Sequence, residues 1–408
     1  MWFFALIFLV LFLGDLVWGW KTSMRVRRLP RPWAGFAMAS VIAFAMLQAA
    51  GIILLFFGRR LDWPVETLFP KPIIAGVYIW HCLVLLPLAF LWFLWRIAAG
   101  VLRIARALSR LKRAETPQPR SENDVSRREF VAASLCTAPA LLALGGTGMA
   151  AYQWNQFRIR RLTLPLANLP KALDGLTIAQ VCDLHVGVFT RGAVLDKIVE
   201  ATNSLRADLV MLPGDLINYS LSDLPVALDV AKRLEGRHGS FVCEGNHDLF
   251  ENPEAFRKLT TDAGLRLLVN DTAMLSIRGV PVQVLGLRWG AAYGDPRATS
   301  SRGDLAIEGS MKELLTLRQR EAFPILLAHH PHAFDFAADI PLTLSGHTHG
   351  GQLMLTKDFG FGPAMFRYWS GLYQKADRAL VVSNGVGNWF PVRVQAPAEI
   401  VHLTLRSV

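Results

Sequence analysis

The sequence is poor in cysteine. Its 408 residues include only Cys82, Cys136, Cys182 and Cys243, and no two of them stand in a Cys-x-x-Cys spacing. The paired-cysteine motifs of zinc ribbons and thiol redox proteins are therefore absent. Each cysteine lies in an apolar stretch, where free cysteine is usually a buried thiol. We expect free thiols, with a disulfide or a thiolate metal ligand as the less favoured interpretation.

Charged residues are also scarce, and the basic ones are unevenly placed. Charged residues make up 18% of the chain and hydrophobic residues 52%, with a mean hydropathy of +0.31, which is too apolar for an ordinary soluble protein. Residues 1–129 hold 17 Lys and Arg against 7 Asp and Glu, and the remainder holds 26 against 25. The C-terminal part thus lacks the basic surface that nucleic-acid binding requires. We expect a membrane part and no nucleic-acid partner.

Apolar stretches of membrane-spanning length lie within residues 1–113. The first, 2–20, is not preceded by the basic segment of a signal peptide, so we expect a retained helix. Two further spans are expected at 33–57 and 73–99. The loop at 21–31 contains five basic residues and no acid, which places it in the cytoplasm and the N-terminus outside.

Two ionisable residues, Asp15 and His81, fall inside these spans. Such residues raise the question of a function, because a charge in lipid is costly. We expect Asp15 to lie near the cytoplasmic interface and His81 to be paired within the helix bundle.

Residues 114–152 connect the membrane part to the rest of the chain. The segment 114–129, rich in Pro, Glu, Ser and Asn, reads as a cytoplasmic linker that ends in Arg127 and Arg128. A double arginine before the moderately apolar stretch 130–152 resembles a twin-arginine export signal, with the export machinery as a partner. A fourth transmembrane helix is the equal alternative. Both interpretations place the residues after 152 outside the cytoplasm.

From residue 158 onward, short β-type runs alternate with helical patterns. The expected strands are 177–182, 208–212, 240–243, 282–287, 325–328, 342–344 and 380–383. The expected helices are 193–205, 226–234, 253–263 and 312–320. This alternation predicts a layered α/β domain, in which ligands gather at the carboxyl ends of strands.

Metal-binding residue types follow five of these strands. His347 and His349, set among glycines, lie on one side of an extended backbone that an ion can approach closely. A histidine pair on a loop is by itself more often solvated, but four further clusters occupy equivalent places. Together the clusters provide seven candidate ligands: Asp183, His185, Asp215, Asn246, His329, His347 and His349. This donor set suits two divalent ions such as Mn, Fe or Zn.

Five ordered motifs resemble those of the calcineurin-like metallophosphoesterases. They are Asp183-x-His185, Gly214-Asp215, Gly245-Asn246-His247-Asp248, His329 and Gly346-His347-x-His349. The resemblance covers about residues 172–407. It is strongest to the bacterial membrane-associated branch, to which some UDP-2,3-diacylglucosamine hydrolases are similar. It implies a four-layer α-β-β-α sandwich over 158–408, following the N-terminal helical membrane region.

The resemblance also implies roles for the site residues. Asp183, His185 and His349 would bind one metal, Asn246, His329 and His347 would bind the other, and Asp215 would bridge them. His247 would stay free of the metals and, together with Asn246, meet the substrate phosphate. His247 and Asp215 are thus the expected catalytic residues. Two cations would polarise the phosphoryl oxygens and generate a hydroxide, while an imidazole protonates the leaving oxygen.

Two residues stand apart from the family pattern. His330 is not needed as a ligand, and we expect a structural role for it. Asn218 stands where many relatives have an aspartate, so the carboxylate expected to orient the catalytic imidazole is missing. The alternative is that Asn218 simply caps the turn after Asp215.

The sequence therefore predicts a multi-pass protein of the inner (cytoplasmic) membrane whose catalytic domain, outside the cytoplasm, hydrolyses phosphate mono- or diesters. Lipid-linked or nucleotide-linked esters are the expected substrates. Aromatic residues could line an apolar entrance or pack in the core: Trp289, Phe366, Trp369, Trp389 and Phe390. The alternative is an extracytoplasmic domain that only binds or senses a phosphorylated ligand. Retention of His247 with all seven ligands argues against that alternative.

Overall fold

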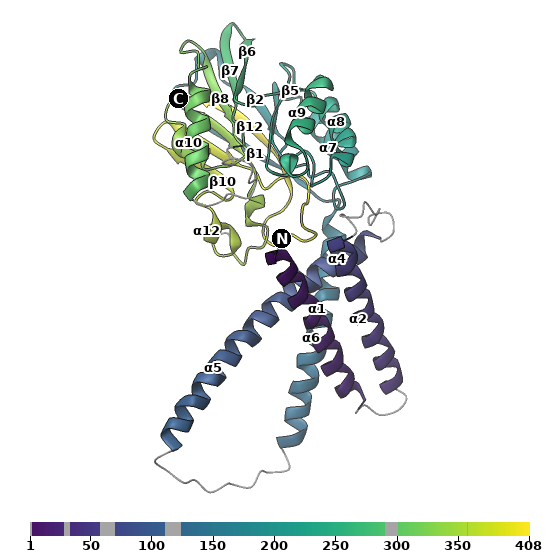
Figure 1. The fold of residues 1–408 in the computed structure, drawn as a ribbon. Helices are drawn as coiled ribbons and strands as arrows, with labels where there is room; N and C mark the ends of the chain where they lie inside the picture. The colour runs from purple at the N-terminus through teal and green to yellow at the C-terminus, as the bar shows by residue number, and fades with distance from the viewer. Residues whose placement is uncertain (1, 28–32, 58–69, 111–123, 290–300, 357) are drawn as a thin grey trace. The chain divides into compact units, whose positions relative to one another are not determined.

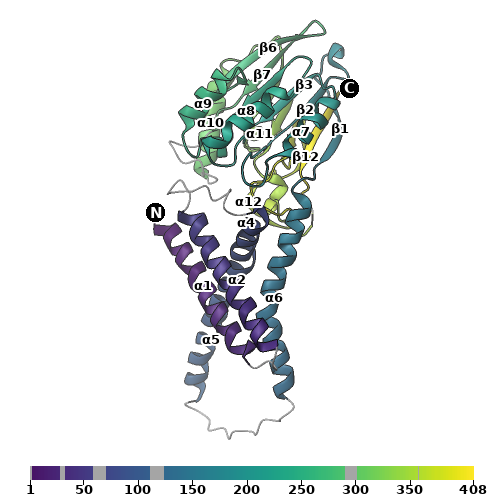
Figure 2. The same ribbon diagram turned by 90° about the vertical axis from the view of Figure 1, so that its right-hand side faces the viewer.

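The chain divides into two compact units, residues 1–151 and 152–408. The computed structural model describes residues 2–27, 33–57, 70–110, 124–289, 301–356 and 358–408. Figures 1 and 2 show the helical first unit and the mixed α/β second unit in two views. Most of the predicted linker, up to residue 123, lies outside the described residues.

The first unit is helical throughout its described part. Its elements are α1 (Trp2–Val26), α2 (Trp33–Phe57), α4 (Lys71–Tyr78), the π-helix η2 (Ile79–Leu85), α5 (Leu86–Arg110) and most of α6 (Asp124–Gln153). Within the described residues, three helical segments are long and apolar enough to cross a membrane: Leu6–Val26, Trp33–Leu54 and Lys71–Arg103. They overlap the three predicted spans. The predicted fourth segment, 130–152, lies in α6, which is not among these three.

A buried polar cluster joins α1 to η2. The Nε1 atom of Trp80 donates to Oδ1 of Asp15 at 2.6 Å, and Nε2 of His81 lies 2.9 Å from Oδ2. The Nδ1 atom of His81 lies 2.8 Å from the carbonyl oxygen of Val77. Asp15, Trp80 and His81 are all buried. The predicted pairing of His81 is therefore observed, whereas Asp15 is enclosed by protein and hydrogen-bonded to the same cluster.

The second unit contains two six-stranded sheets. The first has the order β1 (Arg158–Leu166), β12 (Glu399–Ser407), β2 (Thr177–Gln180), β3 (Leu209–Pro213), β4 (Ser240–Cys243) and β5 (Arg266–Leu267). The second has the order β10 (Gly371–Lys375), β11 (Arg378–Val382), β9 (Leu342–Ser345), β8 (Phe323–Leu327), β7 (Val280–Gly286) and β6 (Asp271–Ile277). Strands β2 to β5 are parallel to one another, as are β7, β8, β9 and β11.

Three buried apolar clusters define four layers. The central one joins the facing sides of the two sheets, through residues such as Met211 of β3 and Ile325 of β8. A second lies between the first sheet and helices α7 (Ala193–Ser204), α8 (Leu224–Arg233) and α9 (Pro253–Asp262). A third lies between the second sheet and helices α10 (Ser301–Leu315) and α11 (Ala333–Phe336). Figure 1 shows these helix groups on opposite outer faces, so the predicted α-β-β-α sandwich is confirmed.

The sequence-based elements differ from the structure in several places. The helix predicted at 312–320 is displaced, because α10 ends at Leu315 and lies mainly upstream. The strands β1, β5, β6, β10 and β12 were not predicted. Of these, β1 and β12 pair with each other in parallel over nine residues, and each carries polar residues on its exposed side that dilute the apolar signal.

The Asp15 cluster generates a stability prediction. Asp15→Leu should destabilise the first unit, because it leaves the buried N–H of Trp80 without its acceptor and Nε2 of His81 without its partner. The double variant Asp15→Leu/His81→Leu should be less destabilised than the sum of the single variants, with a coupling energy of about 0.5–3 kcal/mol. Denaturation of the full chain in detergent, followed by tryptophan fluorescence, measures this difference. If the destabilising effects of the two single variants simply add, the interaction between Asp15 and His81 contributes nothing to stability.

Candidate metal centre

The site is built at the carboxyl ends of strands from both sheets. Asp183 and Asp215 follow β2 and β3, Asn246 follows β4, His329 follows β8, and His347 follows β9. The backbone N–H of His347 donates to Oδ1 of Asp183 at 3.0 Å, which joins the edge of the second sheet to that of the first. The sheet layout thus brings five sequence-distant clusters together, as predicted.

The loops at these strand ends adopt a backbone that side-chain-bearing residues rarely use. Five of the seven candidate ligands have positive φ: Asp183 (54°), His185 (44°), Asp215 (55°), His347 (70°) and His349 (50°). Such conformations persist where the surrounding structure enforces them, and they cluster at functional sites. Neighbouring glycines let the backbone of these loops lie against the two aspartates. A Cβ at Gly346 would collide with the carboxylate of Asp183, and one at Gly245 would collide with that of Asp215.

The first ligand group comprises Asp183, His185 and His349, which are buried. The Nε2 atoms of His185 and His349 face each other at 2.9 Å. They lie 3.8 Å and 3.3 Å, respectively, from Oδ1 of Asp183. Oδ2 of Asp183 is buried and has no hydrogen-bond partner among the described residues. Two imidazole nitrogens and a carboxylate that converge in this way have the donor arrangement of a cation site.

The second group comprises Asp215, His329 and His347, with Asn246 beside them. Nε2 of His329 lies 3.1 Å from Oδ2 of Asp215, and Nδ1 of His347 lies 2.8 Å from Oδ1 of Asn246. The Nδ1 atom of His329 lies 2.7 Å from the carbonyl oxygen of Pro213, which can only accept, so Nδ1 carries a proton. The Oδ2 atom of Asp215 also lies 3.4 Å from Nε2 of His185. Asp215 therefore stands between the two groups.

Burial sets the protonation of the candidate ligands. It lowers the pKa values of His185, His347 and His349 well below the usual value, so these imidazoles are neutral and can act as ligands at pH 7. Burial raises the pKa of Asp183 to about 6 against the opposing charge of His329. Burial alone would lower the pKa of His329, but the charge of Asp215 raises it to about 9. A cation between Asp215 and His329 would take the place of that proton.

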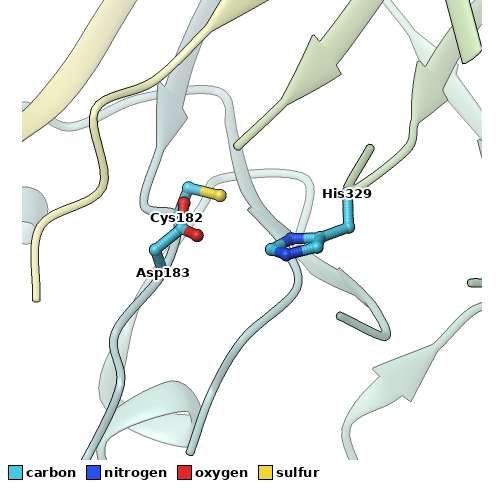
Figure 3. Close-up of side chains that lie close together, drawn as sticks. All are labelled: Cys182, Asp183 and His329. Atoms are coloured by element: carbon cyan, nitrogen blue, oxygen red, sulfur yellow. The ribbon is translucent and has the colours of Figure 1, made fainter. Parts of the chain in front are cut away.

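Cys182 also lies beside Asp183 and His329, as Figure 3 shows. Its Sγ atom is 3.4 Å from the carbonyl oxygen of Pro213. Burial, reinforced by the charge of Asp183, holds the pKa of the Cys182 thiol well above its usual value. The thiolate that metal ligation needs is therefore disfavoured. Cys182 and Cys243 are free and buried, as expected, and Cys82 is free but exposed.

His247 is half-buried at the rim of the site, next to His185. Its Nδ1 atom lies 2.6 Å from the main-chain carbonyl oxygen of Asn218, and its backbone N–H donates to Oδ1 of Asp215 at 2.9 Å. The group that orients the imidazole is thus the carbonyl of Asn218 rather than a side chain. A carboxylate is missing at 218, as noted from the sequence, and the main-chain carbonyl of the same residue supplies an acceptor whatever its side chain.

Two residues that support the site had no assigned role in the sequence analysis. The buried carboxylate of Asp248 accepts the backbone N–H groups of Gly245, Asp215, Leu216 and Ile217, and so ties the loop after β3 to the loop after β4. Both loops present ligands. The position of Asp248, directly after Asn246 and His247, was the one available signal.

Arg393 is the second unforeseen residue. Its buried guanidinium donates to the carbonyl oxygens of Asn384 and Ala396 and to Oδ1 of Asn388, and it lies 3.2 Å from Nδ1 of His349. Burial lowers its pKa to about 10, so Arg393 is still a cation at neutral pH. It braces the loop behind His349 and partly offsets the charge of Asp183.

The remaining predicted residues pack around this centre. His330 is buried, with its ring centroid 5.0 Å from that of His347, and its Nδ1 accepts the N–H of His332. Of the five aromatic residues considered for an entrance, Trp289 and Phe390 are buried and Phe366 and Trp369 half-buried, whereas Trp389 is exposed. Trp389 lies beside His247 and His349, with centroid distances of 6.4 Å and 6.2 Å.

Comparison with known proteins gives a consistent result. A family model described as calcineurin-like phosphoesterase matches residues 176–351. The "Transmembrane protein with metallophosphoesterase domain" of Danio rerio is 30% identical over 315 residues, which cover 75% of this chain and 68% of the relative. The "Uncharacterized metallophosphoesterase YkuE" of Bacillus subtilis is 28% identical and covered over 98% of its length, with 69% of this chain aligned. "Phosphodiesterase YaeI" of Escherichia coli is 25% identical, with 69% of this chain and 99% of the relative aligned.

The matched region begins before the loop that carries Asp183 and His185 and ends just after His349. It therefore includes all five motifs from which the resemblance was drawn. On the ground of the family model and these relatives together, the chain belongs to the calcineurin-like phosphoesterases and is a metal-dependent hydrolase of phosphoric esters.

Proposed function

We propose that this protein is a membrane-anchored phosphoesterase that uses two divalent ions to hydrolyse phosphate mono- or diesters. The observation that carries the proposal is the position of Asp215 between two groups of neutral or carboxylate ligands, with Oδ2 facing His185 on one side and His329 on the other. A carboxylate in that position is suited to bridge two ions. Mn, Fe and Zn all fit this mixed oxygen and nitrogen donor set.

The residues present fit two ions. Asp183, His185 and His349 would hold one, and Asn246, His329 and His347 would hold the other, with Asp215 shared. Buried Oδ2 of Asp183 and Nε2 of His347 both lack hydrogen-bond partners among the described residues. Such orphaned buried atoms are costly unless something else satisfies them. When bound, the ions supply Lewis-acid polarisation of the phosphate and a hydroxide nucleophile at neutral pH.

His247 is the residue that we propose to act on the leaving group. With Nδ1 held by the carbonyl of Asn218, its Nε2 is left to face a substrate. A proton held at Nε2 could pass to the leaving oxygen as the phosphorus–oxygen bond breaks. The Asn246 amide, next to His247 on the same loop, would help to position the phosphate.

A phospho-ligand sensor on a membrane anchor is the second candidate function. It would need the phosphate-binding groups but not a fixed proton donor. The short Nδ1 contact of His247 with Asn218 holds its imidazole in place beside the ligand groups, which favours hydrolysis. Lipid-linked and nucleotide-linked esters remain our proposed substrates, because the apolar helices of the first unit would hold the site close to a bilayer.

Separate substitutions should distinguish the bridging and proton-donating roles. Asp215→Asn should abolish hydrolysis of p-nitrophenyl phosphate and bis-p-nitrophenyl phosphate and lower the bound metal, because one carboxylate holds both ions. His247→Ala should keep the metal and lower kcat by about 10²-fold to 10⁴-fold, the usual contribution of proton transfer. Elemental analysis and steady-state kinetics of the full chain in detergent measure both effects.

The matched control is His238→Asn, in the turn before β4. It should leave the bound metal and kcat unchanged. Equal metal loss in Asp215→Asn and His247→Ala would show that His247 is a ligand. Full activity in Asp215→Asn would remove the bridging role and with it the proposed mechanism.

The contact between His247 and Asn218 makes a second prediction. Asn218→Ala should leave kcat within about threefold of the original, because the main-chain carbonyl that orients His247 is retained. Asn218→Asp should extend activity to higher pH, because a nearby carboxylate favours the protonated imidazole and a general acid works only when protonated. The pH dependence of kcat tests both. A hundredfold loss in Asn218→Ala would show that the side chain, not the carbonyl, positions His247.

We also propose that the phosphoesterase unit lies outside the cytoplasm, on a multi-pass anchor in the inner membrane. Support comes from the basic segments 21–31 and 103–113, which should stay in the cytoplasm and leave one further crossing before residue 152. In this proposal α6 is either that further crossing or a twin-arginine export signal, and both place the phosphoesterase unit outside the cytoplasm. An alkaline phosphatase reporter fused after Arg160 or at the C-terminus should be active. If alkaline phosphatase is inactive at both positions, and a reporter that works only in the cytoplasm is active there, the proposed topology is wrong.

A further inference from the structure

The segment between His349 and the last helix of the second unit carries an unusual apolar surface. Four of its side chains are among the more exposed large hydrophobic residues of the unit: Leu355 (69%), Phe359 (66%), Phe361 (58%) and Met365 (59%). We call these four residues the apolar lobe. Three lie in or next to the turn 353–361, and Met365 ends the short helix α12 (Phe361–Met365). Exposed apolar groups that gather in this way mark interaction sites rather than chance exposure.

The lobe is held in shape by its own backbone. The N–H of Leu355 donates to the carbonyl oxygen of Phe359 at 2.9 Å, and Met354 pairs with Gly360 in an antiparallel bridge. The N–H of Phe361 donates to the carbonyl oxygen of Leu353 at 3.4 Å. Leu355 and Phe359 therefore stand side by side at a closed turn. Their exposure is a property of a fixed structure.

Two aromatic side chains near the lobe also lie beside the metal centre. Phe366, directly after α12, lies 5.5 Å from His347 between ring centroids. On the other side Trp389, 42% exposed, lies 6.2 Å from His349. The buried amide of Gln352 ties the base of the lobe to the loop of Trp389 by donating to the carbonyl oxygens of Phe390 and Val392. An apolar group resting on the lobe could therefore belong to the same molecule as a phosphate at the site.

The lobe also adjoins the point where the chain enters the second unit. The side chain of Gln153, the last residue of α6, donates to the carbonyl oxygen of Arg393 at 2.7 Å and accepts its N–H at 2.9 Å. The next residue, Val394, pairs with Leu353 and accepts the N–H of Met354 at 3.0 Å. Lobe and chain entry thus share one stretch of backbone. The chain that leaves through α6 leads to the three apolar, membrane-length helical segments.

We propose that the apolar lobe inserts into the surface of a lipid bilayer and presents the metal centre to phosphate esters whose apolar tails stay in the lipid. Phenylalanine, leucine and methionine are side chains that enter the boundary between head groups and acyl chains, and tryptophan favours that boundary. The one acid of segment 353–366 is Asp358, which is exposed. Lipid contact is independent of catalysis, whereas the amphiphilic substrate class rests on the proposed function.

Lipid contact can be measured directly on the full chain. The protein is reconstituted in nanodiscs of phosphatidylcholine and phosphatidylglycerol, with Cys82→Ala and Cys136→Ala, so that only the buried Cys182 and Cys243 remain. A nitroxide label is placed at Phe359→Cys or, as a second position, Leu355→Cys. Its collisions with oxygen, which concentrates in lipid, are compared with its collisions with a water-soluble nickel chelate.

The matched control is Leu259→Cys, an exposed leucine (46%) of α9. Both views draw helix α9 well away from α12 within the unit. The ratio of oxygen to nickel collisions should be severalfold higher at 359 and 355 than at 259. Equal ratios would overturn the proposal by showing that the lobe faces water. Labels shielded from both reagents would overturn it by showing that protein covers the lobe.

The substrate class is tested with the variant Leu355→Ser/Phe359→Ser/Phe361→Ser. Its kcat/KM for p-nitrophenyl hexadecyl phosphate in vesicles should fall about tenfold or more, since the burial of three apolar side chains in lipid is lost. Its kcat/KM for soluble bis-p-nitrophenyl phosphate should be unchanged. Retained activity on the vesicle substrate would overturn the presentation role. Inactivity of the unsubstituted protein on both esters would instead refute the proposed function and leave the labelling result standing.

Discussion

The second unit is organised around two carboxylates, Asp183 and Asp215, that are buried a short distance apart between the edges of two sheets. Burying one ionised carboxylate is costly, and burying two together adds their mutual repulsion. Among the described residues, Arg393 and the proton that Asp215 induces on His329 supply positive charge nearby. An apolar core alone would never favour such a centre. The arrangement becomes favourable when cations take up the charge, so the fold and the chemistry depend on the same interaction.

Holding that centre in place requires constraints beyond ordinary sheet packing. Five ligands adopt positive φ, each at a cost of about 1–3 kcal/mol, and the glycines next to them leave no room for a side chain. The compensation comes from hydrogen bonds: Asp248 gathers the backbone of two ligand loops, and Arg393 gathers carbonyl groups of the loop behind His349. Neither residue is among the proposed ligands, yet each fixes where ligands point.

The sequence predicted the layered fold and the convergence of the ligand clusters well, because both follow from local signals. Short apolar runs define buried strands, and polar residues directly after them, such as Asp183 and Asp215, must meet at one edge when the strands are parallel neighbours in one sheet. It could not predict the brace of Arg393, since that contact joins loops distant in the chain. The helical pattern predicted a helix at 312–320, whereas α10 ends at Leu315. The predicted range therefore overlaps only the final turn of the helix. The sequence missed the acceptor of His247 because a main-chain carbonyl leaves no trace in residue type.

The pairing of β1 with β12 has a consequence for how the protein is made. The first strand of the second unit has β12 as its neighbour in the sheet, and β12 also separates it from β2. Partners such as Arg158 and Glu399 are 241 residues apart, so β1 must wait, unpaired, for nearly the whole unit to be synthesised. Long-range pairing of this kind is slow and leaves a strand edge open in the meantime. The nascent chain would therefore remain unfinished next to α6 until residues 399–407 leave the ribosome. A chain in that state exposes an unpaired strand edge to chaperones until β12 has been made.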